Sequence, residues 1–149
     1  DPSIMKKINY FYGDNGKIKQ KIKSKRGYAI SSKTYEYDTR KRVIKINYFN
    51  QDGVLEKLAT YIYNDEEKRQ TKIITDASNK LVHRVESKKN SNNKNIIEAI
   101  FNSKSSLIQK KNIGYNLNGK IARIHDYDML KPEINEKPKL INIITYEYK

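Results

Sequence analysis

Pairs of tyrosines separated by one residue recur along this chain at a nearly constant interval. The second tyrosines of the first three pairs, Tyr12, Tyr37 and Tyr63, are 25 and 26 residues apart, and Tyr115 follows 52 residues later. The copy expected near residue 89 is replaced by Lys88-Lys89-Asn90. A period of this length indicates that one supersecondary unit is repeated in tandem. The residues of this tyrosine motif are Tyr10, Tyr12, Tyr35, Tyr37, Tyr61, Tyr63, Tyr115, Tyr146 and Tyr148.

Clusters of Asn, Asp, Gly and Ser lie about half a period away from the tyrosine motif. Three of these clusters begin at Asn50, Asp76 and Asn102, which are 26 residues apart. Their residue types supply the positive φ or the side-chain capping that tight turns need. The chain is therefore expected to reverse about every 12 to 14 residues, as an antiparallel meander does.

Between the expected turns, the residues alternate with the period of a β-strand. Ile18, Gln20 and Ile22 are interleaved with lysines, and Ile, Val, Tyr and Phe number 40 against 14 Ala, Leu and Met. These residue types and this two-residue periodicity are typical of β-strands. We predict a single all-β domain over residues 1–149: an antiparallel up-and-down meander of about ten to eleven strands, built from hairpin repeats of about 26 residues. The thin aliphatic supply favours an extended or partly closed sheet, with a closed barrel as the alternative.

Three segments depart from the simple pattern. Residues 93–109 carry isoleucines at helical spacing, but the repeat register predicts two strands that meet at the turn 102–105. Residues 129–138 contain two prolines and are expected to form a loop inserted in one repeat. The last expected strand, residues 140–149, is apolar on both faces near its start, as if another group covers it.

The residue types needed for catalysis or metal binding are scarce. His83 and His125 are the only histidines, cysteine is absent, and no serine or threonine stands in an activating context. The turns at Asp14 and Asp52 lack the alternating oxygen ligands of a calcium loop, and no Gly-rich phosphate loop is present. We therefore predict a non-enzymatic protein with no catalytic, metal or cofactor site, in which both histidines are ordinary strand residues.

The formal net charge of +14 is spread along the chain and attracts polyanions at long range. Lysines alternate along one expected strand, which places them on one face, and a second basic cluster follows in the next hairpin. Phosphate or sulfate groups would bind such a surface by charge, with tyrosine rings free to stack on bases or sugars. The alternative is a solvated face that resists aggregation. The candidate polyanion-binding residues are Lys17, Lys19, Lys21, Lys23, Lys25, Arg26, Arg40, Lys41, Arg42 and Lys45.

The segments 10–18, 35–44 and 115–121 join a tyrosine pair or tyrosine to a turn and a following aliphatic residue. In this they resemble tyrosine-aspartate (YD/RHS-type) hairpin repeats, or a variant of bacterial MORN-like repeats. The chain departs from that pattern at Arg40-Lys41 and at Glu67-Lys68, where glycine is missing. The resemblance implies a secreted shell, a surface protein or an interaction scaffold, with no catalysis by the repeats themselves.

Together these features predict an exported bacterial repeat protein, or a fragment of one, at the cell surface or secreted. It would present a basic, tyrosine-rich sheet to a protein or an acidic glycan, with nucleic acid as a further option. No apolar run reaches the ~18 residues of a membrane span. The chain begins at Asp1 without methionine, which suggests a mature form or an excised piece. The alternatives are a cytoplasmic nucleic-acid-binding or toxin-neutralising module and a small-ligand-binding barrel; the oligomeric state stays open.

Overall fold

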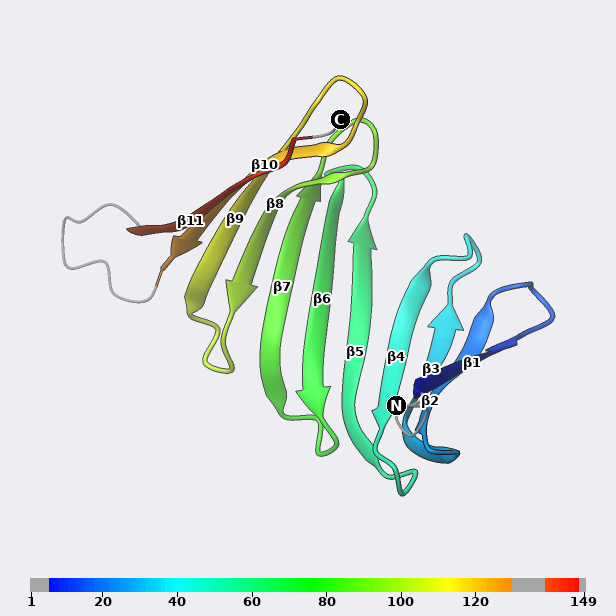
Figure 1. The fold of residues 1–149 in the computed structure, drawn as a ribbon. Coiled ribbons are helices and arrows are strands. Elements are labelled where there is room, and N and C mark those ends of the chain that lie inside the picture. The colour runs from blue at the N-terminus through cyan, green and yellow to red at the C-terminus, as the bar shows by residue number, and fades with distance from the viewer. Residues whose placement is uncertain (1–5, 130–138, 148–149) are drawn as a thin grey trace. The chain divides into compact units, whose positions relative to one another are not determined.

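The computed structural model describes residues 6–129 and 139–147, and every regular element in these ranges is a β-strand. Eleven strands form one antiparallel sheet whose hydrogen-bonded order is the order of the sequence (Figure 1). The predicted all-β meander is confirmed. The strands are β1 (Lys6–Tyr12), β2 (Ile18–Lys25), β3 (Tyr28–Tyr37), β4 (Val43–Phe49), β5 (Leu55–Asn64), β6 (Arg69–Asp76), β7 (Leu81–Lys89), β8 (Asn95–Phe101), β9 (Leu107–Tyr115), β10 (Ile121–Asp128) and β11 (Lys139–Thr145).

The strand order settles two of the alternatives that the sequence left open. It begins at β1 and ends at β11, and no pairing of the described residues joins these two strands, so the sheet is not closed into a barrel. The helix alternative for residues 93–109 is wrong, because β8 and β9 occupy this segment and pair with each other. Its isoleucines are β-branched and favour the extended backbone. Within the described ranges, no helix is present that could cross a membrane.

One turn geometry recurs between the strands. The first turn residue donates its N–H to the carbonyl four residues later, and its own carbonyl accepts from the N–H three residues later. At Asn50 the side-chain Oδ1 also accepts from the N–H groups of Asp52 and Val54, at 2.9 and 3.0 Å. These bonds satisfy the backbone groups that the reversal leaves unpaired. Turns of this kind begin at Gly13, Asp38, Asn50, Asp76, Asn90, Asn102 and Asn116.

The turn that begins at Asn90 lies where the tyrosine motif has been lost. Asn90 still accepts from the N–H groups of Asn92 and Lys94, both at 3.0 Å, and β7 and β8 still pair on either side of it. The repeat of the backbone therefore continues through the segment where the repeat of the sequence fails. Turn chemistry, and not the tyrosine pair, is what each reversal requires.

The fourth residue of each turn adopts the left-handed conformation. Glycine fills this position at residues 16, 53 and 119, whereas Lys41, Lys68 and Ser105 adopt φ values of 60°, 52° and 60°. The glycines missing from the resemblance at residues 40–41 and 67–68 therefore correspond to non-glycine residues held in this region. A residue with a Cβ atom is disfavoured there by about 1–2 kcal/mol.

Replacing Ser105 with glycine should stabilise the protein. We expect a gain of about 0.5–1 kcal/mol in the free energy of unfolding, because relief of the left-handed strain exceeds the entropy that glycine adds to the unfolded chain. Ser103→Gly, two residues earlier in the same turn, is the control and should be neutral or destabilising. Urea unfolding followed by circular dichroism measures both changes, and a loss of stability in Ser105→Gly would contradict the argument.

The tyrosine motif falls on the odd-numbered strands, as the repeat predicts. Tyr10 and Tyr12 lie on β1, Tyr35 and Tyr37 end β3, Tyr61 and Tyr63 lie on β5, and Tyr115 ends β9. Tyr146 follows β11, and Tyr148 lies outside the described residues. β-Bulges occur beside Tyr12 and beside Tyr37, where one extra residue on the partner strand is skipped. A bulge bends the strand and re-aims the side chains next to it.

The described chain divides into two compact units. Unit 1 comprises Asp1–Tyr61 with Ile73–Leu81, and unit 2 comprises Ile62–Lys72 with Val82–Lys149. In unit 1, a small core forms from Ile46, Ala59 and Ile74, which are 9%, 0% and 7% exposed. Tyrosines cover this core in place of the aliphatic residues that the sequence lacks. The partly buried side chains packed on it are those of Tyr35, Val43, Tyr48 and Tyr61.

Candidate functional site

The predicted basic residues of β2 share one face of the sheet because they alternate along the strand. Lys17 precedes the strand, and Arg26 follows it in the two-residue turn to β3. Arg26 and Gly27 have φ values of 51° and 84°, the two positive φ angles that a tight hairpin turn of this type needs. The lysines on the common face are Lys19, Lys21, Lys23 and Lys25.

A row of lysines and tyrosines crosses five strands of unit 1. Tyr10 of β1 lies opposite Lys21, which lies opposite Lys33 of β3. Lys33 lies opposite Tyr48 of β4, which lies opposite Lys57 of β5. Side chains at directly opposite positions point to the same face, so all five gather on one surface. We call these five residues the lysine–tyrosine row.

Cation–π contacts order this row. The Nζ atom of Lys21 is 5.2 Å from the ring centroid of Tyr10, and the Nζ atoms of Lys33 and Lys57 are 4.5 and 5.2 Å from that of Tyr48. Each contact stabilises by about 0.5–1 kcal/mol where the site is exposed. The rings therefore hold the ammonium groups close to the sheet without neutralising their charge.

The row places like charges side by side. Lys21 and Lys33 are half-buried and lie directly opposite each other, an arrangement that destabilises a sheet. No carboxylate belongs to the row. A row of unit 2 is built differently: Glu98 lies opposite Lys111, which lies opposite Asp126 with its Nζ 4.0 Å from the carboxylate. The lysine–tyrosine row thus places three lysines, and no acidic residue, at successive paired positions of the sheet.

The second predicted basic cluster is arranged differently. Arg42 is bound to Asp38, with 2.8 Å between Nε and Oδ2, and Lys45 is 3.4 Å from the carboxylate of Glu36. The backbone N–H and side chain of Arg42 hold the pKa of Asp38 below its usual value. Lys45 stands on the face of β4 opposite to Tyr48, because their positions differ by three, an odd number, and side chains alternate along a strand. The structure therefore does not bring this cluster, which also includes Arg40 and Lys41 of the β3–β4 turn, together with the lysine–tyrosine row.

A hollow of about 640 Å³ opens in unit 1 beside the β1–β2 turn. It brings two of the predicted cations, Lys17 and Lys19, together with three members of the tyrosine motif. Those tyrosines come from the ends of β1 and β3, where the two bulges lie. We call this cavity the tyrosine hollow. The residues that line it are Tyr12, Gly13, Asp14, Asn15, Lys17, Lys19, Tyr35, Glu36, Tyr37 and Ile44.

Two of these tyrosines are fixed parts of the wall. The hydroxyl of Tyr37 donates a hydrogen bond of 2.8 Å to the carbonyl of Ile18, the first residue of β2. Burial raises the pKa of Tyr37, and burial together with the neighbouring tyrosines raises that of Tyr35. Tyr35 also packs on the core of unit 1, so both side chains are anchored in the wall. Tyr12, in contrast, is 65% exposed and presents its ring to solvent.

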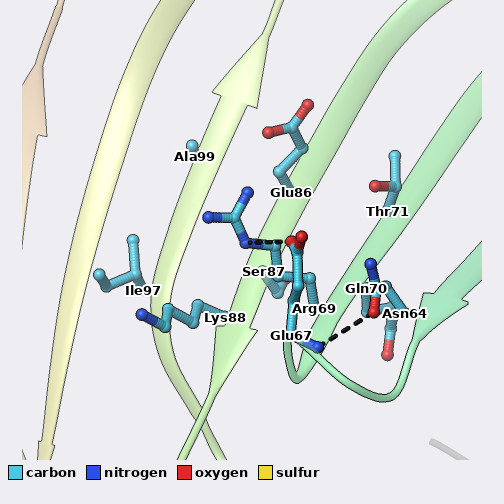
Figure 2. A pocket seen from close by; sticks show the side chains of 10 residues that line it. All are labelled: Asn64, Glu67, Arg69, Gln70, Thr71, Glu86, Ser87, Lys88, Ile97 and Ala99. Carbon is cyan, nitrogen blue, oxygen red and sulfur yellow. Dashed lines mark hydrogen bonds and ion pairs between the residues drawn. The ribbon is translucent and has the colours of Figure 1, made fainter.

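A second hollow, of about 390 Å³, belongs to unit 2 (Figure 2). Figure 2 shows Arg69 beside Glu67, and their Nε and Oε2 atoms are 3.2 Å apart. Glu86 and Lys88 add one charge of each sign to the wall, so it offers no excess charge to an ion. Ser87 is 7% exposed, and no histidine lines the hollow to activate its hydroxyl. This hollow therefore combines a balanced set of charged side chains with a serine that has no histidine beside it.

Both histidines lie in strands, His83 in β7 and His125 in β10. The ring of His125 meets that of Tyr127 edge-on, with 6.4 Å between the centroids. Over residues 6–129 and 139–147, no three His, Cys, Asp or Glu side chains come together in a way that could hold a metal ion.

Sequence reasoning missed three members of the lysine–tyrosine row, namely Lys33, Tyr48 and Lys57. They stand on three different strands, and only the register of the hairpins aligns them with Lys21. One signal was available in the sequence. Arg26-Gly27 is a two-residue hairpin turn, which fixes the pairing of Lys25 with Tyr28. A β-bulge between Lys23 and Ser24 then shifts the register by one residue, so this signal does not by itself align Lys21 with Lys33.

No family model matches this chain, and no curated protein matches it. It is similar to the crystal structure of a protein of unknown function from Bacteroides fragilis NCTC 9343. The similarity covers 97% of this chain and 94% of the other, with 11% sequence identity and a TM-score of 0.50. At this identity the similarity concerns the fold alone, and it extends over nearly the full length of both chains.

Proposed function

We propose that this chain is a non-enzymatic binding protein whose lysine–tyrosine row binds a polyanionic macromolecule. One observation carries the proposal: Lys21, Lys33 and Lys57 stand in a single row across the strands, and the rings of Tyr10 and Tyr48 contact their ammonium groups. The proposal retains the sequence-based expectation of an exported bacterial protein with a protein or an acidic glycan as partner. An intracellular nucleic-acid-binding module is the alternative.

Repulsion between neighbouring lysines destabilises the row, and a bound polyanion would relieve that repulsion. Lys21 and Lys33 repel each other across one strand spacing of about 4.8 Å, and the nearby tyrosine rings reduce that repulsion only in part. An anionic group between them interacts favourably with both. A polymer adds the entropy of the counterions that it releases, one for each charge that it loses.

The geometry suits an extended chain that lies across the strands. Lys57 stands two strands beyond Lys33, so the cations follow one another at roughly 5 and 10 Å along the row. The tyrosines between and beside them offer flat rings to the parts of the polymer that carry no charge. Charge and aromatic surface therefore alternate along a single line.

Binding to heparin should show a steep salt dependence that the row controls. In the double variant Lys21→Gln/Lys33→Gln, we expect about tenfold weaker binding at physiological salt. The slope of log affinity against log salt should fall by about 2, one for each lost contact. Titration calorimetry at several salt concentrations measures both quantities.

The matched control removes two positive charges from the other face. Lys7 and Lys45 alternate away from Tyr10 and Tyr48 on their own strands, so Lys7→Gln/Lys45→Gln gives the same net charge while the row stays intact. We expect this control to weaken binding by about twofold at most. Equal losses in the two double variants would show that net charge alone governs binding and would refute the role of the row.

A further inference from the structure

The tyrosine hollow adjoins the lysine–tyrosine row, because Lys19 and Tyr35 of its wall stand two residues from Lys21 and Lys33 on the same strands. We propose that the tyrosine hollow binds one sugar unit of an acidic polysaccharide, whose other anionic groups lie along the row. This inference rests on the proposed function and names its ligand class.

The aromatic side of the hollow suits a sugar ring. Tyr12 is 65% exposed at the end of β1, while the hydroxyl of Tyr37 is bound to β2 and Tyr35 packs on the core of unit 1. The face of an aromatic ring is electron-rich, and the C–H groups on one face of a pyranose carry a partial positive charge. Tyr12 therefore offers a platform on which a sugar ring can stack, at the mouth of a hollow that is already formed.

The cationic side suits the acidic group of that sugar. Within the described part of the chain, the ammonium groups of Lys17 and Lys19 form no ion pair. Lys19 is exposed and lies about 7 Å from Lys21 along β2, so the positive surface of the row continues into the hollow. A carboxylate or sulfate on the sugar would be drawn to this pair of lysines.

The polar groups of the β1–β2 turn favour a sugar over a nucleic acid. Asp14 brings a carboxylate to the hollow, and a carboxylate can only accept hydrogen bonds. Sugar hydroxyls donate to such a group, whereas a phosphodiester has no donor and would be repelled by it. The side-chain oxygen of Asn15 already accepts from the N–H of Lys17 at 2.9 Å, which leaves its amide N–H groups as the donors that Asn15 can offer to a hydroxyl oxygen. The carboxylate of Glu36, also in the wall, is engaged by Lys45.

The test compares Tyr12→Ala with Tyr28→Ala, a control that removes a still more exposed tyrosine (79%) from β3 outside the hollow. The probe is a heparin-derived tetrasaccharide, and the reference is an oligothymidylate with the same number of charges. We expect Tyr12→Ala to weaken tetrasaccharide binding about tenfold and to leave oligothymidylate binding within twofold. Tyr28→Ala should change neither affinity. Circular dichroism of each variant establishes that the fold is retained.

Three outcomes would overturn the inference. If Tyr12→Ala binds the tetrasaccharide within twofold of the unaltered chain, no sugar stacks in the hollow. If it loses oligothymidylate to the same extent, the hollow does not select sugars. If Asp14→Asn strengthens tetrasaccharide binding as much as it strengthens oligothymidylate binding, the carboxylate acts only by charge. In each case, salt-dependent heparin binding that still requires Lys21 and Lys33 would leave the proposed function standing.

Discussion

Replacing Ile46 with alanine is expected to lower the free energy of unfolding by about 2–4 kcal/mol. Ile46 is 9% exposed and lies directly opposite Ala59, the most buried residue of unit 1. The side chain of Ala59 is a single methyl group, too short to fill the space that the smaller residue would leave. The loss therefore combines the transfer free energy of the missing methyl and methylene groups with the cost of a cavity. Urea unfolding monitored by circular dichroism gives the change directly.

Ile30→Ala is the matched control for this prediction. Ile30 lies on β3 in the same unit, but it is 40% exposed, so its truncation should cost less than about 1 kcal/mol. A similar, small loss in both variants would mean that unit 1 has no core in the usual sense. The stability of its sheet would then come from turns, backbone pairing and surface side chains.

Few apolar side chains are buried because the sequence contains few aliphatic residues. Ile46, Ala59 and Ile74 are the only buried apolar residues of the described ranges, and four partly buried residues, three of them tyrosines, surround them. Tyrosine can cover an aliphatic cluster with its ring while its hydroxyl stays in water or finds a partner. In this way twelve tyrosines make up part of the aliphatic deficit.

The order and type of the strands could be predicted because two local signals agree. The alternation of Ile with Lys in β2 specifies an extended segment, and Asn50, Asp76 and Asn102 specify where the chain reverses. Each signal acts over a few residues and needs no tertiary contact. The segment around Asn90 shows that the turn signal is sufficient, because the reversal persists there without the tyrosines.

The candidate site was only partly predictable, because it depends on register. Lys21 could be assigned to a basic face from its own strand, but its alignment with Lys33, Tyr48 and Lys57 is set by three successive pairings. A shift of one residue in any pairing would send a strand's side chains to the other face. The tyrosine hollow depends in addition on the β-bulges at Tyr12 and Tyr37. The residue types in those segments do not predict a bulge.

The second tyrosine of the motif makes the same contact in both units. The hydroxyl of Tyr37, the last residue of β3, donates to the carbonyl of Ile18, the first residue of β2, at 2.8 Å. The hydroxyl of Tyr115, the last residue of β9, donates to the carbonyl of Asn95, the first residue of β8, at 2.7 Å. Each bond ties the end of one strand to the beginning of the strand before it. This shared bond gives a physical reason for the recurrence of tyrosine at that position.

Tyr37→Ser should therefore lower the free energy of unfolding by about 2–3 kcal/mol, because it removes a half-buried ring together with its hydrogen bond. Tyr37→Phe, which keeps the ring and removes the hydroxyl, should lower it by about 1 kcal/mol. Lys19→Ser is the control, because Lys19 is exposed on β2 next to Ile18. This variant should change the free energy of unfolding by less than about 0.5 kcal/mol. Urea titrations of the three variants separate the contributions of the ring and the bond. If Tyr37→Ser proved as harmless as Lys19→Ser, the tyrosine motif would have no structural role, and its recurrence would have to be explained by binding alone.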